Sequence, residues 1–130
     1  MPITFSNIHV GESYSRPSLA SLWGYASYEA ISRGVVTPKE DNKIVLFVTE
    51  QKQESAEPYV DRLNGKVLQW EGPNDHFAEG RMLAAAVSGE EIHLFHRDRH
   101  HSDFVYIGML KSISQSVRKG SPSKFTFEVI

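Results

Sequence analysis

The segment Lys43-Ile44-Val45-Leu46-Phe47-Val48-Thr49 places five consecutive apolar residues between polar flanks. It is rich in β-branched and aromatic side chains, and it is too short for a typical helix. Such a run predicts a central strand that is buried on both faces, because a strand with one solvated face alternates polar and apolar residues. A sheet built around residues 43–49 is therefore the starting point for the fold.

Four further segments predict strands around this centre. Asn64-Gly65 is a tight-turn signal that leads into a strand over residues 66–70. Residues 91–97 predict another strand, and residues 103–110 follow a basic loop as its expected hairpin partner. Residues 124–130 alternate, which predicts one shared face for Phe125, Phe127 and Val129.

Two short helices are also predicted. The first opens at Ser15 or Arg16, with Pro17 suited to its first turn and Gly24 to its end. The second is capped by Asp75 and runs through apolar residues at helical spacing to Ser88-Gly89. The sum is an α+β fold with two or three short helices. Because the strands are short and frequent, we expect a strongly curved mixed sheet or a small β-barrel.

Length and composition exclude several classes of protein. A chain of 130 residues, with 40% hydrophobic and 23% charged residues, predicts one globular domain over residues 1–130. The chain has no cysteine, which excludes disulfides, thiolate metal sites and cysteine nucleophiles. No apolar run approaches the roughly 20 residues needed to span a bilayer, and residues 1–4 show no export signal. We therefore expect a cytoplasmic protein that does not contact membranes.

The charge is unevenly distributed along the chain. Residues 1–96 hold 8 Lys and Arg against 13 Asp and Glu, whereas residues 97–130 hold 6 against 3. The formal net charge of −2 thus conceals a basic C-terminal third. Such a segment either attracts a polyanion or is an ordinary solvated edge.

Motifs for metal binding or catalysis are weak. His93 and His96 are three residues apart on a predicted strand, so they should point to opposite faces of the sheet. His96 could converge with His100 and His101, but the two arginines between them would repel a cation, and contact with phosphates is the stronger reading. The sequence has no nucleophile elbow and no glycine-rich phosphate loop. No metal, cofactor or catalytic residue is expected.

The aromatic residues suggest a different task. Both tryptophans and several tyrosines lie near turns or among polar residues, and some stand beside charges, as in Tyr14-Ser15-Arg16 and Tyr59-Val60-Asp61. Each one could simply be packed in a core. Together they suit a site that holds a planar base between aromatic rings while a carboxylate accepts from its exocyclic amine. Arginine or lysine at the rim would then hold the flanking phosphates.

The order of the motifs resembles a known bacterial domain over almost the whole chain. The ordered set is Tyr14-x-Arg16, Arg33-Gly34-Val35-Val36, Leu46-Phe47-Val48-Thr49 with Lys52, Tyr59-x-Asp61, Leu68-x-Trp70, Leu94-Phe95-x-Arg97 and Phe104-Val105-Tyr106-Ile107-Gly108. It is similar to the domain at the C-terminus of bacterial restriction helicases, which also stands beside nuclease domains in modification-dependent restriction systems. The resemblance implies an SRA-like or PUA-like reader of 5-methylcytosine or 5-hydroxymethylcytosine.

On this interpretation the chain is a non-catalytic specificity module that flips a modified base out of double-stranded DNA. A nuclease or helicase domain, fused or separate, is its expected companion in phage defence. The expected walls of the base pocket are Trp23, Tyr25, Tyr59, Asp61 and Trp70. The expected contacts to the DNA backbone are Tyr14, Arg16, Lys52, Arg97 and Arg99.

Two other classes of function stay open. The first is a small nuclease or nucleotide-acting enzyme, with Asp61, Glu71 and the histidines as its working groups. The second is a protein-interaction module of a defence system, in which the aromatic residues are merely packed. Deep burial of Trp23, Trp70 and Tyr59 with no cleft nearby would favour the second.

Overall fold

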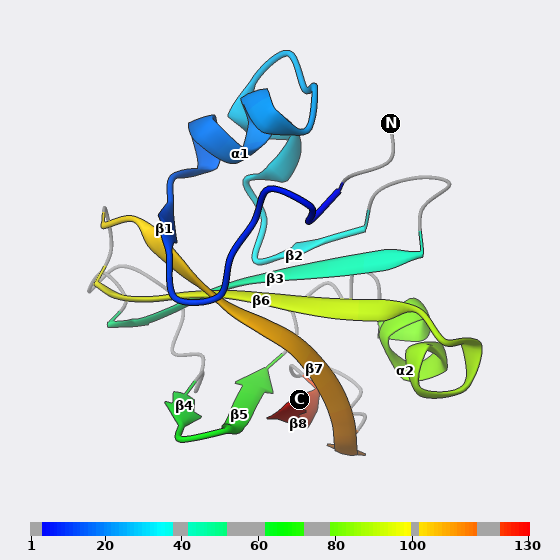
Figure 1. The fold of residues 1–130 in the computed structure, drawn as a ribbon. Coiled ribbons are helices and arrows are strands. Elements are labelled where there is room, and N and C mark those ends of the chain that lie inside the picture. Colours follow the sequence, from blue (N-terminus) through cyan, green and yellow to red (C-terminus); the bar gives the residue numbers. More distant parts are fainter. Residues whose placement is uncertain (1–3, 38–41, 52–61, 72–78, 100–101, 117–122) are drawn as a thin grey trace.

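The computed structural model describes residues 4–37, 42–51, 62–71, 79–99, 102–116 and 123–130. Figure 1 shows their arrangement, with the helix over residues 16–22 on one side of the long central strands (residues 43–51 and 91–99) and the strands over residues 62–71 and 124–129 on the other. The elements in chain order are β1 Ser13–Tyr14, α1 Arg16–Leu22, the 3-10 helix η1 Tyr28–Ile31, β2 Val35–Val36, β3 Lys43–Gln51, β4 Arg62–Asn64, β5 Val67–Glu71, α2 Glu79–Ser88, β6 Glu91–Arg99, β7 Phe104–Ser116 and β8 Lys124–Val129.

All the strands belong to one mixed sheet with the order β2-β3-β6-β7-β8-β5-β4, and β1 pairs with the start of β7. The pair β3–β6 is parallel, and every other pair is antiparallel. The predicted α+β class and mixed sheet are therefore confirmed. Within the described ranges no pairing joins β2 to β4, so the sheet is open and the expected closed barrel is not found.

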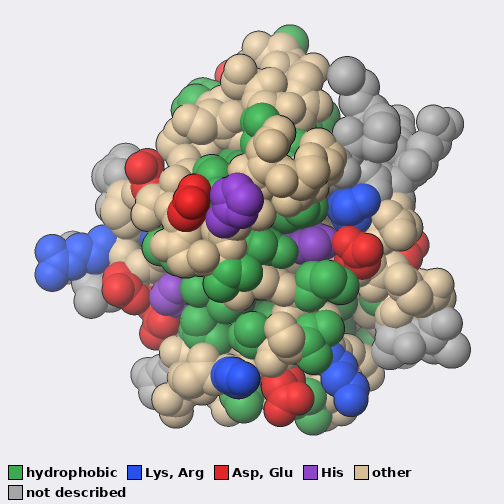
Figure 2. Space-filling view, viewed as in Figure 1, with side chains coloured by type: hydrophobic (Ala, Val, Ile, Leu, Met, Phe, Trp, Pro, Cys, Tyr) green, Lys and Arg blue, Asp and Glu red, His purple; other side chains and the backbone are tan. Residues whose placement is uncertain are grey.

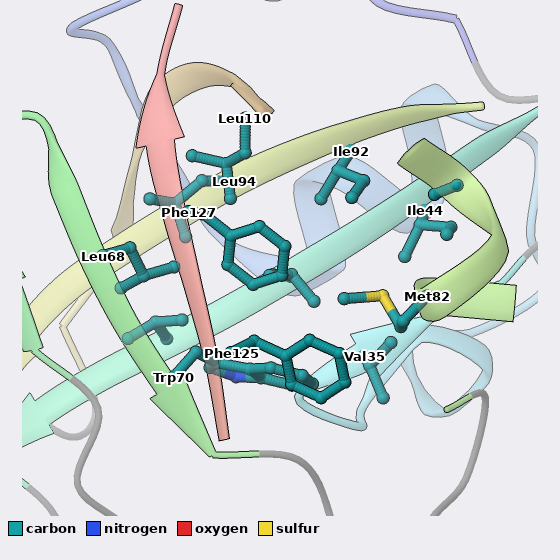
Figure 3. Packing of buried hydrophobic residues seen from close by; sticks show 13 residues of the cluster. Val35, Ile44, Leu68, Trp70, Met82, Ile92, Leu94, Leu110, Phe125 and Phe127 are labelled. Atoms are coloured by element: carbon teal, nitrogen blue, oxygen red, sulfur yellow. The ribbon is translucent and has the colours of Figure 1, made fainter. Parts of the chain in front are cut away.

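The central strand β3 is buried on both faces, as its apolar run predicts. Ile44, Leu46 and Val48 point into one core, whereas Val45 and Phe47 point into another. We call the first the α2-side core, because it includes Met82 and Ala85 of α2, and Figure 3 shows its packing. We call the second the α1-side core, because it includes Leu19 and Ala20 of α1. The alternation of one strand thus connects two hydrophobic layers.

Strand β7 bends so that it can serve two partners. Its pairing with β6 shifts register between Leu94 and Phe95, and its pairing with β8 shifts between Ser112 and Ser114. Each irregularity increases the local twist. The first half of β7 therefore continues the β3–β6 layer, and the second half carries β8, β5 and β4 around the α2-side core (Figure 1). The turn at Asn64-Gly65 with the strand that we predicted after it, and the hairpin that we predicted over residues 91–110, are confirmed.

The helices follow their sequence signals. Ser15 is the N-cap of α1, and its side chain accepts from the backbone N–H of Ser18. Gly24 has a φ of 80°, a left-handed conformation that costs glycine little, and it ends this helix as predicted. Helix α2 ends before Gly89, whereas the predicted cap Asp75 lies outside the described residues. None of the described helices is long and apolar enough to cross a membrane.

The N-terminal segment is held on the α1-side core by aromatic contacts. The ring of Phe5 stacks on that of His93 with centroids 3.7 Å apart. His93 is buried, and its ring nitrogens lie 2.8 Å from the hydroxyl of Tyr106 and 2.8 Å from a carboxylate oxygen of Glu91. Burial, together with the Glu91 charge, raises the pKa of Tyr106 to about 12. His93 is therefore a structural residue with both nitrogens engaged.

We expect Phe95→Ala to lower the free energy of unfolding by about 3–5 kcal/mol. Phe95 is fully buried, and its ring contacts Phe5, Trp23 and Phe47, so its removal leaves a cavity in the α1-side core. Urea denaturation measures the change. Ile113→Ala is the matched control, because Ile113 is 53% exposed and should change stability by no more than about 0.5 kcal/mol. Similar losses for both variants would contradict this account of the core.

Candidate nucleic-acid interface

The surface does not present one uniformly basic face in the view of Figure 2. Hydrophobic side chains gather over the middle of this view, where β6 and β7 run in Figure 1, and charged side chains of both signs lie around them. A polyanion site on this chain must therefore be sought as a local feature, such as a cleft in which a few cations converge.

Such a cleft lies where α1 meets the end of β6 and the start of β7. It has a volume of about 490 Å³. Strand β1 places α1 here, because Ser13 and Tyr14 pair with the first residues of β7. We call it the arginine cleft, and its lining residues are Ser15, Arg16, Pro17, Tyr28, Arg97, Ser102, Asp103 and Phe104.

The side chain of Arg16 is fixed from several sides. Its Nε donates to the backbone carbonyl of Ile31 at 3.0 Å, and a terminal nitrogen donates to that of Arg33 at 3.3 Å. Its guanidinium carbon lies 4.7 Å from the ring centroid of Phe47 and 4.9 Å from that of Phe104. These contacts hold the cation against two aromatic faces, an arrangement that favours arginine over lysine.

Arg97 is held in a similar way from β6. Its Nε donates to the hydroxyl of Thr49 at 2.7 Å, and a terminal nitrogen donates to the carbonyl of Ser102 at 3.0 Å. Its guanidinium carbon lies 4.2 Å from the ring centroid of Phe104, so Phe104 contacts both arginines. The cleft thus contains two pre-positioned cations that share one aromatic ring.

The electrostatics of the cleft favour an anion. Burial, with a further contribution from the positive charge of Arg97, lowers the pKa of Arg16 to about 10. Burial also lowers the pKa of Arg97. Among the residues that the structure describes, no carboxylate lies at ion-pair distance from either guanidinium. A phosphate bound between them would relieve their repulsion and accept hydrogen bonds from both forks.

A second hollow lies beside Trp70, with a volume of about 250 Å³. Trp70 stands on β5 and contacts Phe125 of β8, with ring centroids 5.5 Å apart. Figure 3 shows these rings side by side, near Val35 and Met82. We call this hollow the Trp70 cavity, and its lining residues are Gln69, Trp70, Glu71, Lys124, Phe125 and Thr126.

The structure separates the two tryptophans that the sequence analysis assigned to one pocket. Trp23 is 3% exposed in the α1-side core, and its Nε1 donates to the carbonyl of Thr4 at 2.9 Å. Tyr25 packs against the same core, whereas Trp70 belongs to the α2-side core. Sequence proximity to turns could not reveal this, because the two cores lie on opposite faces of β3. Trp23 and Tyr25 therefore do not share a pocket with Trp70.

Of the described residues expected to contact the DNA backbone, only two line the arginine cleft. Arg16 and Arg97 meet in the arginine cleft, and Arg99 is exposed at the end of β6. The hydroxyl of Tyr14 accepts from the backbone N–H of His9 at 2.8 Å and lies 3.3 Å from a carboxylate oxygen of Glu12. The remaining expected residues, Lys52, Tyr59 and Asp61, lie outside the described residues.

Some lining residues were missed from the sequence. Tyr28 is 49% exposed at the arginine cleft, and its position near a turn was a usable signal. Lys124 and Thr126 line the Trp70 cavity only because β8 pairs with β5, with Lys124 opposite Glu71. No local pattern reports that pairing.

The arrangement expected for an enzyme is not assembled by the described strands. Glu71 ends β5, whereas His93 and His96 lie on β6, and β7 and β8 lie between these strands in the sheet. His93 is enclosed in the α1-side core, and Nε2 of His96 lies 2.6 Å from a carboxylate oxygen of Glu50. Asp61, the third expected group, lies outside the described residues.

The fold is similar to that of SRA domains in solved structures. No protein-family model matches the sequence, and no curated protein matches it either. The SRA domain of SUVH5 in complex with hemimethylated CG DNA is similar over 100% of this chain and 94% of that one, with a TM-score of 0.66 and 15% identity. The same domain bound to fully hydroxymethylated CG DNA gives a TM-score of 0.60 at 14% identity.

A restriction endonuclease is also among the similar structures. The DNA modification-dependent restriction endonuclease AspBHI is similar over 94% of this chain and 73% of that one, with a TM-score of 0.58 and 15% identity. The fold and the expected resemblance to SRA-like domains therefore agree.

We expect pyrophosphate to raise the Tm of the protein, because an anion in the arginine cleft stabilises the folded state. At ten times its Kd the rise should be about 3–6 °C. Thermal unfolding is compared with sodium chloride at equal ionic strength. Arg97→Gln should remove the rise, and Lys111→Gln, an exposed residue far along β7, should keep it. Equal rises in the parent chain and Arg97→Gln would place the anion elsewhere.

Proposed function

We propose that this chain is a non-catalytic reader of modified cytosine in double-stranded DNA. It would flip a 5-methylcytosine or 5-hydroxymethylcytosine out of the duplex and serve as the cytoplasmic specificity module of a modification-dependent restriction system. The observation that carries the proposal is an SRA-like fold in which two arginines converge in one cleft, with no carboxylate of the described residues at ion-pair distance from either guanidinium. SRA domains crystallised with methylated and hydroxymethylated DNA share this fold.

The Trp70 cavity is the proposed receptor for the base. Its volume of about 250 Å³ is smaller than that of pockets for drug-sized ligands, which begin at about 300 Å³. Strand β4 runs beside it, because Arg62 pairs with Gln69. In the sequence the Tyr59-x-Asp61 motif directly precedes Arg62, the first residue of β4. We assign Tyr59 and Trp70 as stacking rings and Asp61 as the acceptor for the exocyclic amine.

The energetics favour an enclosed base over groove contact. Burial of a methyl group in an apolar pocket contributes only about 1 kcal/mol to the binding free energy. A contact in the groove buries the methyl group only partly and therefore contributes less. Flipping costs a few kcal/mol, and stacking on aromatic rings returns about 1–3 kcal/mol per base. Contacts to phosphates must supply the remaining affinity. The arginine cleft provides two of them through Arg16 and Arg97, and Arg99 extends the basic edge.

The proposal predicts that the chain prefers a DNA duplex with one 5-methylcytosine over the same duplex with cytosine by at least about fivefold. Fluorescence anisotropy with labelled duplexes measures both affinities. Asp61→Ala should abolish the preference and leave the affinity for unmodified duplex almost unchanged, because it removes the acceptor for a flipped base and no proposed phosphate contact. Glu29→Ala, which removes an exposed carboxylate of η1, is the matched control.

Three outcomes would reject a reader function. Equal affinity for modified and unmodified duplexes would show that no modification is read. A complete absence of DNA binding would favour the protein-interaction alternative. Cleavage of the duplex with added Mg²⁺, lost in Asp61→Asn, would favour the nuclease alternative.

The phosphate contacts have a separate signature in the salt dependence of binding. For duplex DNA, log affinity falls as log salt concentration rises, and each phosphate contact makes this slope steeper by about 0.9. Arg97→Gln should therefore make the slope less steep by about one. It should also lower the affinity for modified and unmodified duplexes by the same factor. Arg16→Lys keeps the charge but loses the two-pronged fork, so it should weaken binding with little change in slope. Lys111→Gln should leave the slope unchanged.

A further inference from the structure

Three metal-ligating side chains that play no part in the proposed DNA contacts meet at the ends of β3 and β6. They are Glu50, His96 and Asp98, and one ligand atom from each lies within 4.8 Å of the others. A carboxylate oxygen of Glu50 lies 2.6 Å from Nε2 of His96. Two strands that run in parallel bring the three together, because Val48 pairs with His96 and the chains continue in the same direction.

The sheet separates this cluster from the neighbouring arginines. His96 and Asp98 are two residues apart on β6, so they share one face, and Arg97 and Arg99 belong to the other. The contacts of Arg97 agree with this placement. Its Nε donates to the hydroxyl of Thr49, and its guanidinium lies over the ring of Phe104, which belongs to the α1-side core. The repulsion that the sequence suggested between these arginines and a cation is therefore weakened, because the arginines point away from the cluster.

We propose that Glu50, His96 and Asp98 form a binding site for a divalent transition-metal ion such as Zn²⁺ or Mn²⁺. One imidazole and two carboxylates form a mixed nitrogen and oxygen donor set. Mg²⁺ and Ca²⁺ prefer oxygen ligands alone, so the imidazole selects against them. Three protein ligands leave further coordination positions for water or another ligand, as in open metal sites.

The geometry can close on an ion with small movements. Bonds of about 2.0–2.1 Å to a tetrahedral Zn²⁺ separate its ligand atoms by about 3.3 Å. That separation lies between the 2.6 Å of the Glu50–His96 contact and the 4.8 Å that bounds the whole group. Asp98 is exposed and can rotate, whereas the side chain of His96 is only 12% exposed and is already in place. The ion would replace the direct contact between Glu50 and His96 and join β3 to β6.

The test uses the full chain without an affinity tag, after treatment with a chelator. Isothermal titration with Zn²⁺ and with Mn²⁺ should show one ion per chain. His96→Gln and Asp98→Asn should each weaken binding by about tenfold or more. With Co²⁺, visible absorption bands should appear in the parent chain and weaken in both variants, and circular dichroism verifies that the variants are folded.

The matched controls are close in the sequence and are not among the three residues of the cluster. Asp103→Asn changes an exposed carboxylate of the arginine cleft, and the double variant His100→Gln/His101→Gln removes the nearby histidines. Both should bind the ion as the parent does. The proposal is overturned if no saturable binding is seen, or if folded Asp98→Asn binds as tightly as the parent. It is also overturned if the histidine double variant alone loses binding. None of these readouts depends on DNA binding.

Discussion

The parallel pairing of β3 with β6 is the constraint on which the rest of this molecule depends. Both strands contribute to two cores at once, because alternate residues of each strand face opposite layers. The pairing also sets the end of the sheet where function gathers. Thr49 stands beside Arg97 there and orients it toward the arginine cleft, and Glu50 turns to the other face toward His96. One register therefore positions two chemically opposite sites, one on each face.

The arginine cleft illustrates how a fold can hold like charges close together. Two guanidinium groups contact Phe104, and the pKa of Arg16 is lowered to about 10 by burial and by the neighbouring charge. Backbone carbonyls and the hydroxyl of Thr49 hold the groups in place without neutralising them. This arrangement costs free energy in the absence of an anion and recovers it on binding one. It is pre-organisation for a phosphate, and it does not depend on a high net charge for the chain.

The candidate site could be predicted only in part from the sequence. The sequence predicts Arg16 and Arg97 as contacts to the DNA backbone, from their aromatic neighbours and the basic C-terminal third, and the structure brings the two together in one cleft. Their mutual approach could not be foreseen, because 81 residues separate them and β1 brings α1 to the start of β7. The aromatic residues misled in one respect. The sequence analysis assigned Trp23 to the wall of the base pocket, yet Trp23 fills the α1-side core and its N–H donates to the backbone carbonyl of Thr4.

The amino-acid sequence by itself determined the local elements. The apolar run at residues 43–49, the Asn64-Gly65 turn and the cap at Ser15 each act over a few residues, so their physics is visible in the chain. Tertiary structure alone decided the strand order, the bends in β7 that leave the sheet open, and the assignment of each aromatic to one core or the other. The reason is that sheet pairing joins distant segments through backbone hydrogen bonds, which carry little trace in residue type.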